Sequence, residues 1–205
     1  MTEVASSERV SKRQRTRERI VREAVALFAE RGFDAVTVAE ITAAAGVARS
    51  TFFRHFPDKA DVLFEDDSAS HLLLAKAVAG AARTKAPLGD SLADALRAAH
   101  SGCLVLADSK AVQALHFPMR EQLIAETAQL QACSLVKERG YTDALEAALI
   151  EQGAEPLIAR QAAHLATACY DAGYAEAFTT PDLLPSTVDR AFKRLFAVGL
   201  DRDSS

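Results

Sequence analysis

Residues 37–56, TVAEITAAAGVARSTFFRHF, have the pattern of a helix, a tight turn and a second helix with polar side chains. Thr37 and Glu40 have the spacing of a capping box, in which a hydroxyl and a carboxylate each take a backbone N–H group at the start of a helix. Gly46 stands where a helix needs a residue that tolerates positive φ in order to end. We therefore expect one helix to begin at Val38 and a second helix to follow the glycine.

The second of these helices alternates hydrogen-bond donors with aromatic rings. Phe52 and Phe56 lie one turn apart, so we expect both rings to anchor the helix. The polar side chains between them are then free to enter a major groove of DNA. Ala48 stands at the expected N-cap and has no capping side chain, which costs about 1 kcal/mol of local stability.

The order of the surrounding segments makes the pattern specific. An amphipathic helix closed by residues 31–33 precedes the capping box, and residues 57–59, PDK, follow the aromatic helix. Over residues 15–64 the chain resembles the DNA-binding domain of the TetR family of bacterial transcriptional regulators. The resemblance implies an all-α protein of about nine helices. It would have an N-terminal three-helix helix-turn-helix domain and a C-terminal helical domain for ligand binding and dimerisation.

The resemblance and the chemistry of the side chains together indicate the DNA contacts. The expected set is Thr37, Arg49, Ser50, Thr51, Phe53, Arg54, His55 and Lys59. Arg49 is the expected base reader, because its guanidinium fits guanine O6 and N7 together, and its two neighbours meet base edges or thymine methyls. Phosphate contacts are expected from Thr37, His55 and Lys59. Phe53 stands where relatives usually carry a Tyr, and its ring is expected to pack on the DNA backbone. Arg54 is either a further contact or the partner of an acidic neighbour such as Asp58.

Positive charge is concentrated at the N-terminal end of the chain. The whole chain has 24 basic and 28 acidic residues, but residues 1–60 carry 11 basic against 8 acidic ones. Residues 1–14 are expected to form a flexible basic arm, which either follows DNA phosphates or only keeps the protein soluble. The expected helix-turn-helix domain covers residues 15–60, and the ligand-binding and dimerisation domain covers residues 61–205.

The C-terminal part is expected to be helical and to form a homodimer. A fourth helix is expected from Asp58 to about Arg83, and small residues are frequent in the segment 155–179. In TetR-like proteins the two C-terminal helices pair across a two-fold axis, and the resemblance implies the same here. The expected interface residues are Leu165, Ala168, Ala172, Phe178, Val188, Phe192 and Phe196. The alternative is that these side chains fill the core of the monomer.

A small-molecule effector is implied by the resemblance, because helices four to seven enclose a ligand site in the family and its occupation moves the fourth helix. Polar and aromatic residues in otherwise apolar helices are the candidate contacts: His71, His100, His116, Phe117, Arg120, His164, Tyr170 and Tyr174. Each of them, taken alone, is more commonly a core or surface residue. The many Leu and Ala residues favour an apolar ligand. The TFFRHF helix resembles that of a subgroup in which some members respond to fatty acyl thioesters, whose phosphate Arg120 or Arg83 would meet.

The expected function is a ligand-responsive transcriptional regulator, a repressor, that binds a palindromic operator as a dimer and is released by a small apolar molecule. No cofactor or metal is expected, since the three cysteines are far apart and the histidines lack metal-ligand spacing. The sequence shows no secretory leader or membrane-spanning run, so we expect a cytoplasmic protein. The alternatives are a nonspecific architectural DNA-binding protein and a helical enzyme with an unrecognised site, although GxSxG, GxGxxG and HExxH motifs are missing.

Overall fold

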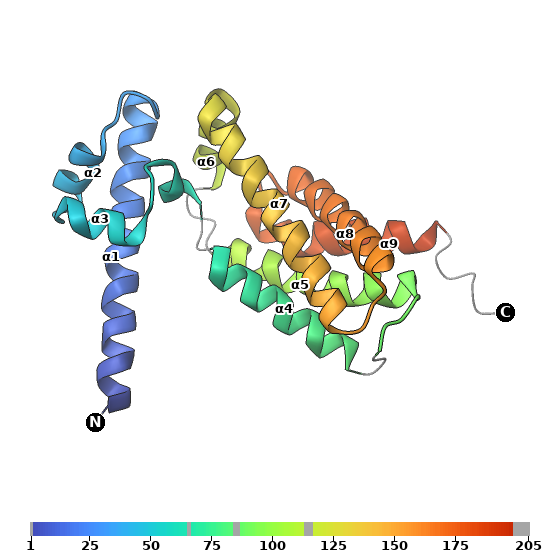
Figure 1. Ribbon diagram of the computed structural model, residues 1–205. Coiled ribbons are helices and arrows are strands. Elements are labelled where there is room, and N and C mark those ends of the chain that lie inside the picture. The colour runs from blue at the N-terminus through green and yellow to red at the C-terminus, as the bar shows by residue number, and fades with distance from the viewer. Residues whose placement is uncertain (1, 65–66, 84–86, 113–116, 199–205) are drawn as a thin grey trace. The chain divides into compact units, whose positions relative to one another are not determined.

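A computed structural model describes residues 2–64, 67–83, 87–112 and 117–198 of the chain, and its regular structure over these residues is helical (Figure 1). This confirms the all-α fold of about nine helices for the described residues. Two compact units divide the chain: Met1–Glu65 with Met119–Cys133, and Asp66–Pro118 with Ser134–Ser205. The α-helices are α1 (Thr2–Arg31), α2 (Val38–Ala44), α3 (Arg49–His55), α4 (Asp67–Ala82), α5 (Leu92–Val112), α6 (Phe117–Glu126), α7 (Ala128–Glu151), α8 (Pro156–Glu176) and α9 (Leu184–Ala197), and the 3-10 helices include η1 (Ala60–Leu63) and η3 (Pro181–Leu183).

The first unit closes around an aromatic core. Phe28 of α1 and Phe52 of α3 are at most 1% exposed. Leu123 of α6 and Leu130 at the start of α7 are buried in the same core, which is why residues 119–133 belong to this unit. From the sequence these residues are expected in the C-terminal domain, because nothing local to them indicates which core they enter.

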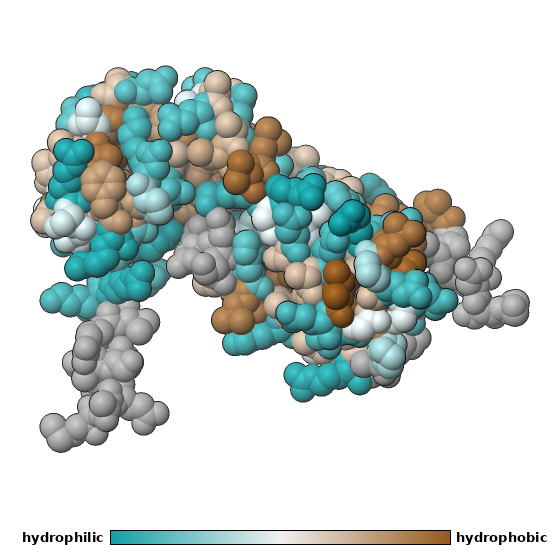
Figure 2. All heavy atoms as spheres, in the orientation of Figure 1, coloured by the Kyte–Doolittle hydropathy of each residue, from teal (hydrophilic) through white to brown (hydrophobic). Residues whose placement is uncertain are grey.

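The helix α1 begins at Thr2, so the residues from Thr2 to 14, expected as part of a flexible arm, are helical. Figure 1 shows the N-terminal part of α1 extending past α2 and α3. Of its described basic side chains, Lys12, Arg13, Arg15 and Arg19 are exposed and Arg17 is half-buried. In Figure 2 this part of α1 is coloured as hydrophilic up to the grey residues. The N-terminal basic residues therefore lie on a helix rather than on an extended arm.

The segment after α3 also differs from the expectation. Instead of one helix from Asp58 to about Arg83, the structure has the short η1 and then α4. Phe64 ends η1 with an extended backbone, at φ −113° and ψ 146°. Residues 65–66, between the two helices, lie outside the described residues. The expected continuous fourth helix is thus replaced by two separate helices.

Two arginines hold the end of η1. Arg17 of α1 donates from Nη2 to the carbonyl oxygen of Phe64 at 3.1 Å. Arg120 of α6 donates from Nε to the carbonyl oxygen of Leu63 at 2.7 Å, and its guanidinium lies 5.2 Å from the ring centre of Phe64. Charged donors make the stronger class of hydrogen bond, and here they satisfy carbonyl groups that end a helix. The end of η1 is therefore held by two other helices of the first unit.

The second unit packs α4, α5, α8, α9 and the part of α7 from Ser134 around one core. The stripe of α5 that recurs at intervals of three and four residues is buried, as with Leu96 and Cys103. Gly102 lets α4 approach α5, since a Cβ there would lie 3.0 Å from Cγ2 of Val78. Close packing at this glycine fixes the distance between the two helices.

The helices α8 and α9 approach most closely at Gly173. A Cβ on this residue would lie 2.6 Å from both the Cα and the backbone nitrogen of Val188. The hydroxyl of Thr187, at the same level, donates to the carbonyl oxygen of Gly173 at 2.7 Å. Only glycine fits between the two helix backbones at this point, so the sequence specifies the α8–α9 contact there.

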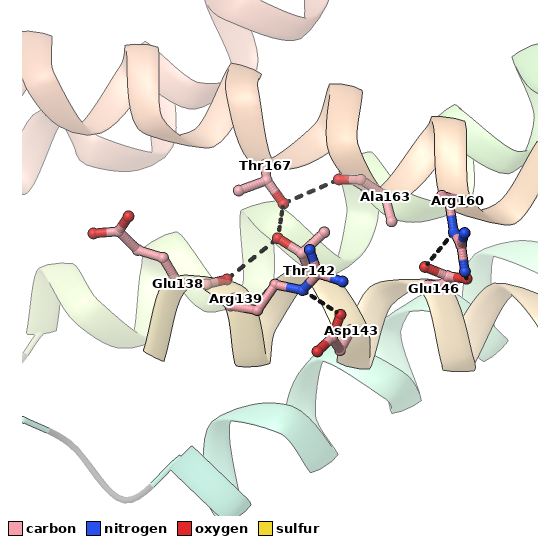
Figure 3. Close-up of polar contacts among 8 residues, drawn as sticks. All are labelled: Glu138, Arg139, Thr142, Asp143, Glu146, Arg160, Ala163 and Thr167. Carbon is pink, nitrogen blue, oxygen red and sulfur yellow. Dashed lines mark hydrogen bonds and ion pairs between the residues drawn. The ribbon is translucent and has the colours of Figure 1, made fainter. Parts of the chain in front are cut away.

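A polar seam joins α7 to α8 (Figure 3). The hydroxyl oxygens of Thr142 and Thr167 lie 2.9 Å apart, and each hydroxyl also lies within hydrogen-bond distance of a carbonyl on its own helix. Farther along the seam, Arg160 Nη2 lies 3.1 Å from Oε1 of Glu146. Thr142 is 5% exposed, so its hydroxyl needs these partners. The seam sets the register of α7 against α8.

Candidate DNA-binding site

The start of α2 is fixed by the capping box predicted from the sequence. The Thr37 backbone N–H donates to Oε2 of Glu40 at 2.8 Å, and the Glu40 N–H donates to the Thr37 hydroxyl oxygen at 3.3 Å. The Thr37 hydroxyl donates to the same carboxylate, which also pairs with Arg31 at 2.6 Å. These hydrogen bonds, those from Thr37 first, lower the pKa of Glu40 to about 2. Thr37 therefore caps the helix by accepting the Glu40 N–H, and both of its own donors bind the Glu40 carboxylate.

The turn from α2 to α3 needs its glycine. Gly46 has φ +60°, in the left-handed region that side chains rarely adopt. The N–H of Val47 then reaches back to the carbonyl oxygen of Thr42 at 3.0 Å, and its side chain packs on the core of the first unit. Ala48 follows as the N-cap of α3 without a side-chain hydrogen bond, as the sequence predicts.

The helix α3 has one buried and one exposed face. Phe52 and Phe56 are 0% and 1% exposed, with their ring centres 5.5 Å apart, so they anchor the helix. Arg49, Ser50, Phe53 and Arg54 are exposed on the remaining surface, and Thr51 is half-buried beside them. This arrangement presents donors and one aromatic ring on a helix whose position is fixed from behind.

Arg49, the side chain expected to read a base, is exposed on α3. Its guanidinium lies 5.5 Å from the ring centre of Phe53, and it makes no hydrogen bond or ion pair within the described part of the chain. Stacking on an exposed ring limits the positions of the guanidinium while all its donors stay available. Arg54 likewise forms no ion pair with Asp58, which removes the structural alternative considered for it.

His55 closes α3 among positive charges. Burial, the first cause, and then Arg13, Arg54 and Arg17 lower the pKa of its imidazole. Its Nδ1 is buried and has no hydrogen-bond partner among the described residues. Arg13 and Arg17 were not named in the sequence analysis as neighbours of His55. Their spacing of four residues on one helix face is a signal, but only the packing of α1 shows what that face meets.

Lys59 is held inside the first unit. Its ammonium donates to the carbonyl oxygens of Phe33 at 2.8 Å and Val36 at 2.9 Å, and lies 4.1 Å from the ring centre of Phe33. From the sequence this ammonium is expected to contact phosphate. In the structure, it joins the turn before α2 to the turn after α3.

The expected effector contacts do not form one group. His71, His100, Tyr170 and Tyr174 lie in the second unit, where His71 packs edge-on to Tyr141 at 5.0 Å and has a buried, unpartnered Nε2. His100 stacks on a core ring of α9 at 4.4 Å, and His164 is exposed. Arg120 belongs to the first unit, where it holds η1. His116 lies outside the described residues, and so does the side chain of Phe117. Residues 84–86, which follow Arg83, lie outside them as well.

The expected interface residues separate into two groups by burial. Val188 and Phe192 are 0% exposed in the core of the second unit, so they present no surface to a partner. They fill the monomer's own core because α9 packs on α8 and α5. Ala168, Ala172 and Phe178 are exposed, and Leu165 and Phe196 are half-buried. Figure 2 shows hydrophobic side chains on the visible surface of the second unit.

Part of the first unit matches a known family of sequences. Residues 20–65 match the profile described as bacterial regulatory proteins, tetR family. Over 61 residues the chain is 43% identical to the HTH-type transcriptional regulator TcmR of Streptomyces glaucescens, covering 30% of this chain and 27% of that protein. Over 122 residues it is 31% identical to MftR of Mycobacterium tuberculosis, to which regulation of mycofactocin biosynthesis is attributed, covering 60% and 58%. The aligned part thus spans about a quarter of one relative and somewhat over half of the other.

Solved structures share the fold at low sequence identity. A transcriptional regulator from Aquifex aeolicus VF5 has a TM-score of 0.53 at 17% identity, with 89% of this chain and 99% of that chain covered. SmeT in complex with triclosan has a TM-score of 0.53 at 22% identity, with 93% and 96% covered. A regulator from Streptomyces coelicolor has a TM-score of 0.52 at 19% identity, with 90% and 94% covered. Among the described residues, no helix is long and apolar enough to cross a membrane.

Proposed function

We propose that this chain, a TetR-family transcriptional regulator, represses transcription by binding a palindromic operator as a homodimer, and that a small apolar molecule releases it. The observation that carries the proposal is the exposed face of α3. Arg49 and Arg54 project from a helix that Phe52 and Phe56 anchor from behind. An anchored helix with free donors on one face is the arrangement that reads base edges in a major groove.

The phosphate contacts we propose are fewer than the sequence alone indicated. Thr37 uses its hydroxyl and amide hydrogens on Glu40, so a phosphate beside it would bind the next N–H groups of α2. Lys59 uses two of its three donors on carbonyl oxygens. His55 and the exposed arginines therefore carry more of the expected backbone affinity. Ser50, Thr51 and Phe53 complete the surface that faces DNA.

Dimerisation is proposed from the exposed part of α8 and the end of α9. A single seven-residue recognition helix covers few base pairs, so sequence-specific binding needs two copies on a two-fold site. Ala168 and Ala172 lie exposed on α8 with Leu165 half-buried, and small residues let two helices approach closely. Phe178 is 42% exposed and supplies an apolar side chain at the end of the helix.

The second unit is the proposed site of effector binding. Its core combines many small and aliphatic residues with His71, Tyr141, Tyr170 and Tyr174 at its edge. A few polar groups within an apolar lining are typical of small-molecule sites. SmeT, a protein of the same fold, forms a complex with triclosan, and this complex supports an apolar effector. Arg120 and His100 are left out of the proposed site, because both side chains are bound elsewhere.

Selection from a pool of random-sequence duplexes tests the proposal. The purified protein is incubated with the pool at one fixed salt concentration, and bound DNA is amplified and sequenced over several rounds. We expect a palindromic motif whose half-site centres lie one helical turn, or a multiple of it, apart. A pool that binds but acquires no motif would instead indicate an architectural DNA-binding protein, whose binding depends on salt and not on sequence.

A further inference from the structure

The imidazole of His55 occupies an unusual position for a surface residue of a DNA-binding unit. Its Nδ1 is buried and has no hydrogen-bond partner among the described residues. Its Nε2 is not among the buried unpartnered atoms, so it is the nitrogen open to solvent. The ring packs beside Phe56, with the centres 6.2 Å apart. The fold therefore fixes the ring without using either nitrogen.

Three arginines surround this ring from two helices. Arg54 precedes it on α3, whereas Arg13 and Arg17 lie one turn apart on α1, and all three act on its charge. Arg17 is positioned by the core, because its guanidinium lies 5.0 Å from the ring centre of Phe56 and bonds to the carbonyl oxygen of Phe64. Arg13 is exposed on the next turn. Arg13 and Arg54 are thus exposed, and both act on the charge of an imidazole whose Nε2 is open to solvent.

Carboxylates near His55 have other partners. The only charged residue of α2, Glu40, binds Thr37 and Arg31. In the turn after α3, the Asp61 carboxylate accepts the Asp58 N–H at 3.0 Å, and the Asp58 carboxylate accepts the Lys59 N–H. On α3 the remaining charge is Arg49, six residues away and stacked on Phe53. The charges that lower the pKa of the imidazole are all positive, those of Arg13, Arg54 and Arg17.

We propose that Arg13, Arg54 and His55 form one site for a DNA phosphate, and that His55 takes up a proton when a phosphate fills it. This inference rests on the proposed DNA-binding function and adds to it a contact from α1. That contact lies outside residues 20–65, which match the family profile. A phosphate between the arginines reverses the field that keeps the imidazole neutral. The imidazolium then donates a charge-assisted hydrogen bond from Nε2 to the phosphate.

Linkage fixes the direction of the effect. In the free protein, burial and the arginines lower the pKa of His55, so its imidazole is neutral at pH 7.5. In the complex, the negative phosphate raises that pKa. Between the two values the complex holds one proton more per half-site, so the affinity for DNA increases as pH falls, by up to about tenfold per pH unit per half-site.

The test is a set of anisotropy titrations between pH 6 and pH 8. The probe is a mixed-sequence 30-base-pair duplex at constant ionic strength, because phosphate contacts need no sequence. We expect the wild-type affinity to rise toward low pH, His55→Gln to remove that rise, and Lys76→Gln, at an exposed lysine of the second unit, to keep it. Retention of the full pH dependence in His55→Gln would overturn the inference, as would its absence from the wild type.

The contribution of Arg13 has a separate measurement. Arg13→Ala is expected to reduce the slope of log affinity against log salt by about 0.9, the value for one phosphate contact. It is also expected to move the pH range over which the affinity changes to higher pH, because one positive charge near the imidazole is lost. Arg15→Ala changes a neighbouring exposed arginine on another face of α1 and is expected to leave the pH dependence unchanged. Equal effects of the two substitutions would show a diffuse charged helix and overturn the site. If the wild type binds no DNA at any pH, the proposed function itself fails; binding without His55-dependent linkage refutes only this inference.

Discussion

Lys59 connects two turns of the DNA-binding unit through three contacts of one ammonium group. The carbonyl oxygens of Phe33 and Val36 accept its hydrogen bonds, and the ring of Phe33 lies beside the charge. Both carbonyls belong to the turn that leads into the cap of α2. Removing the ammonium leaves both carbonyls without their donor, and this lowers the stability of the unit whether or not DNA is present.

Lys59→Met is therefore expected to lower the free energy of unfolding by about 2 kcal/mol, a value within the range for hydrogen bonds to a charged group. The chain has no Trp, so far-UV circular dichroism in a urea titration is the suitable measurement. Lys76→Met, at an exposed lysine of α4, provides the control and is expected to change little. Unchanged stability of Lys59→Met, with a loss of DNA affinity only, would show that the lysine acts on phosphate instead.

Glu40 makes the same turn sensitive to acid. Hydrogen bonds from Thr37 and then Arg31 hold its pKa at about 2 instead of 4.5. A carboxyl with a lowered folded-state pKa contributes stability above its unfolded value, and that contribution is lost as pH falls through the folded value. Between about pH 5 and about pH 2 the Tm of the wild type should thus fall more steeply than that of Glu40→Gln. Equal slopes in the two proteins would contradict this.

At the scale of elements, the contact of α8 with α9 depends on one glycine. The backbone of Val188 occupies the position where a Cβ on Gly173 would lie, at 2.6 Å. Gly173→Ala is expected to separate the helices and to lower the free energy of unfolding by about 1–3 kcal/mol, as in overpacked cores. Gly80→Ala in α4, with nothing within 4 Å of the new Cβ, should be neutral or stabilising by up to about 1 kcal/mol in the same denaturation experiment. The same loss in both variants would refute the close-packing argument.

Local elements of the fold followed from the sequence, and long-range ones did not. The capping box of Thr37, the left-handed Gly46 and the paired rings of α3 each depend on residues within one turn of each other, so their spacing predicts them. The internal contacts of Lys59 join residues 23 or more positions apart. Likewise, only the packed structure shows that residues 119–133 enter the first core and that Val188 is buried. Sequence periodicity shows that a face is apolar, but not what covers it.

At the scale of the whole molecule, the function that we propose needs two copies of the chain. Ala172 is exposed near the C-terminal end of α8, on the surface proposed for dimerisation. Ala172→Arg should convert a dimer to a monomer in sedimentation velocity, because a guanidinium prevents close approach of two helices. Ala147→Arg, at an exposed position of α7, should remain dimeric with the same thermal stability. A dimer that survives both substitutions would place the interface elsewhere.

The central claim, sequence-specific DNA binding by the exposed face of α3, is tested most directly by one titration. The selected duplex and a scrambled duplex of equal length are titrated at one salt concentration with the wild type and with Arg49→Ala. The wild type is predicted to prefer the selected duplex by about a thousandfold or more. Arg49→Ala is predicted to reduce that preference by about tenfold or more, while its affinity for scrambled DNA changes much less. Equal, weak binding of both duplexes by the wild type would contradict the claim.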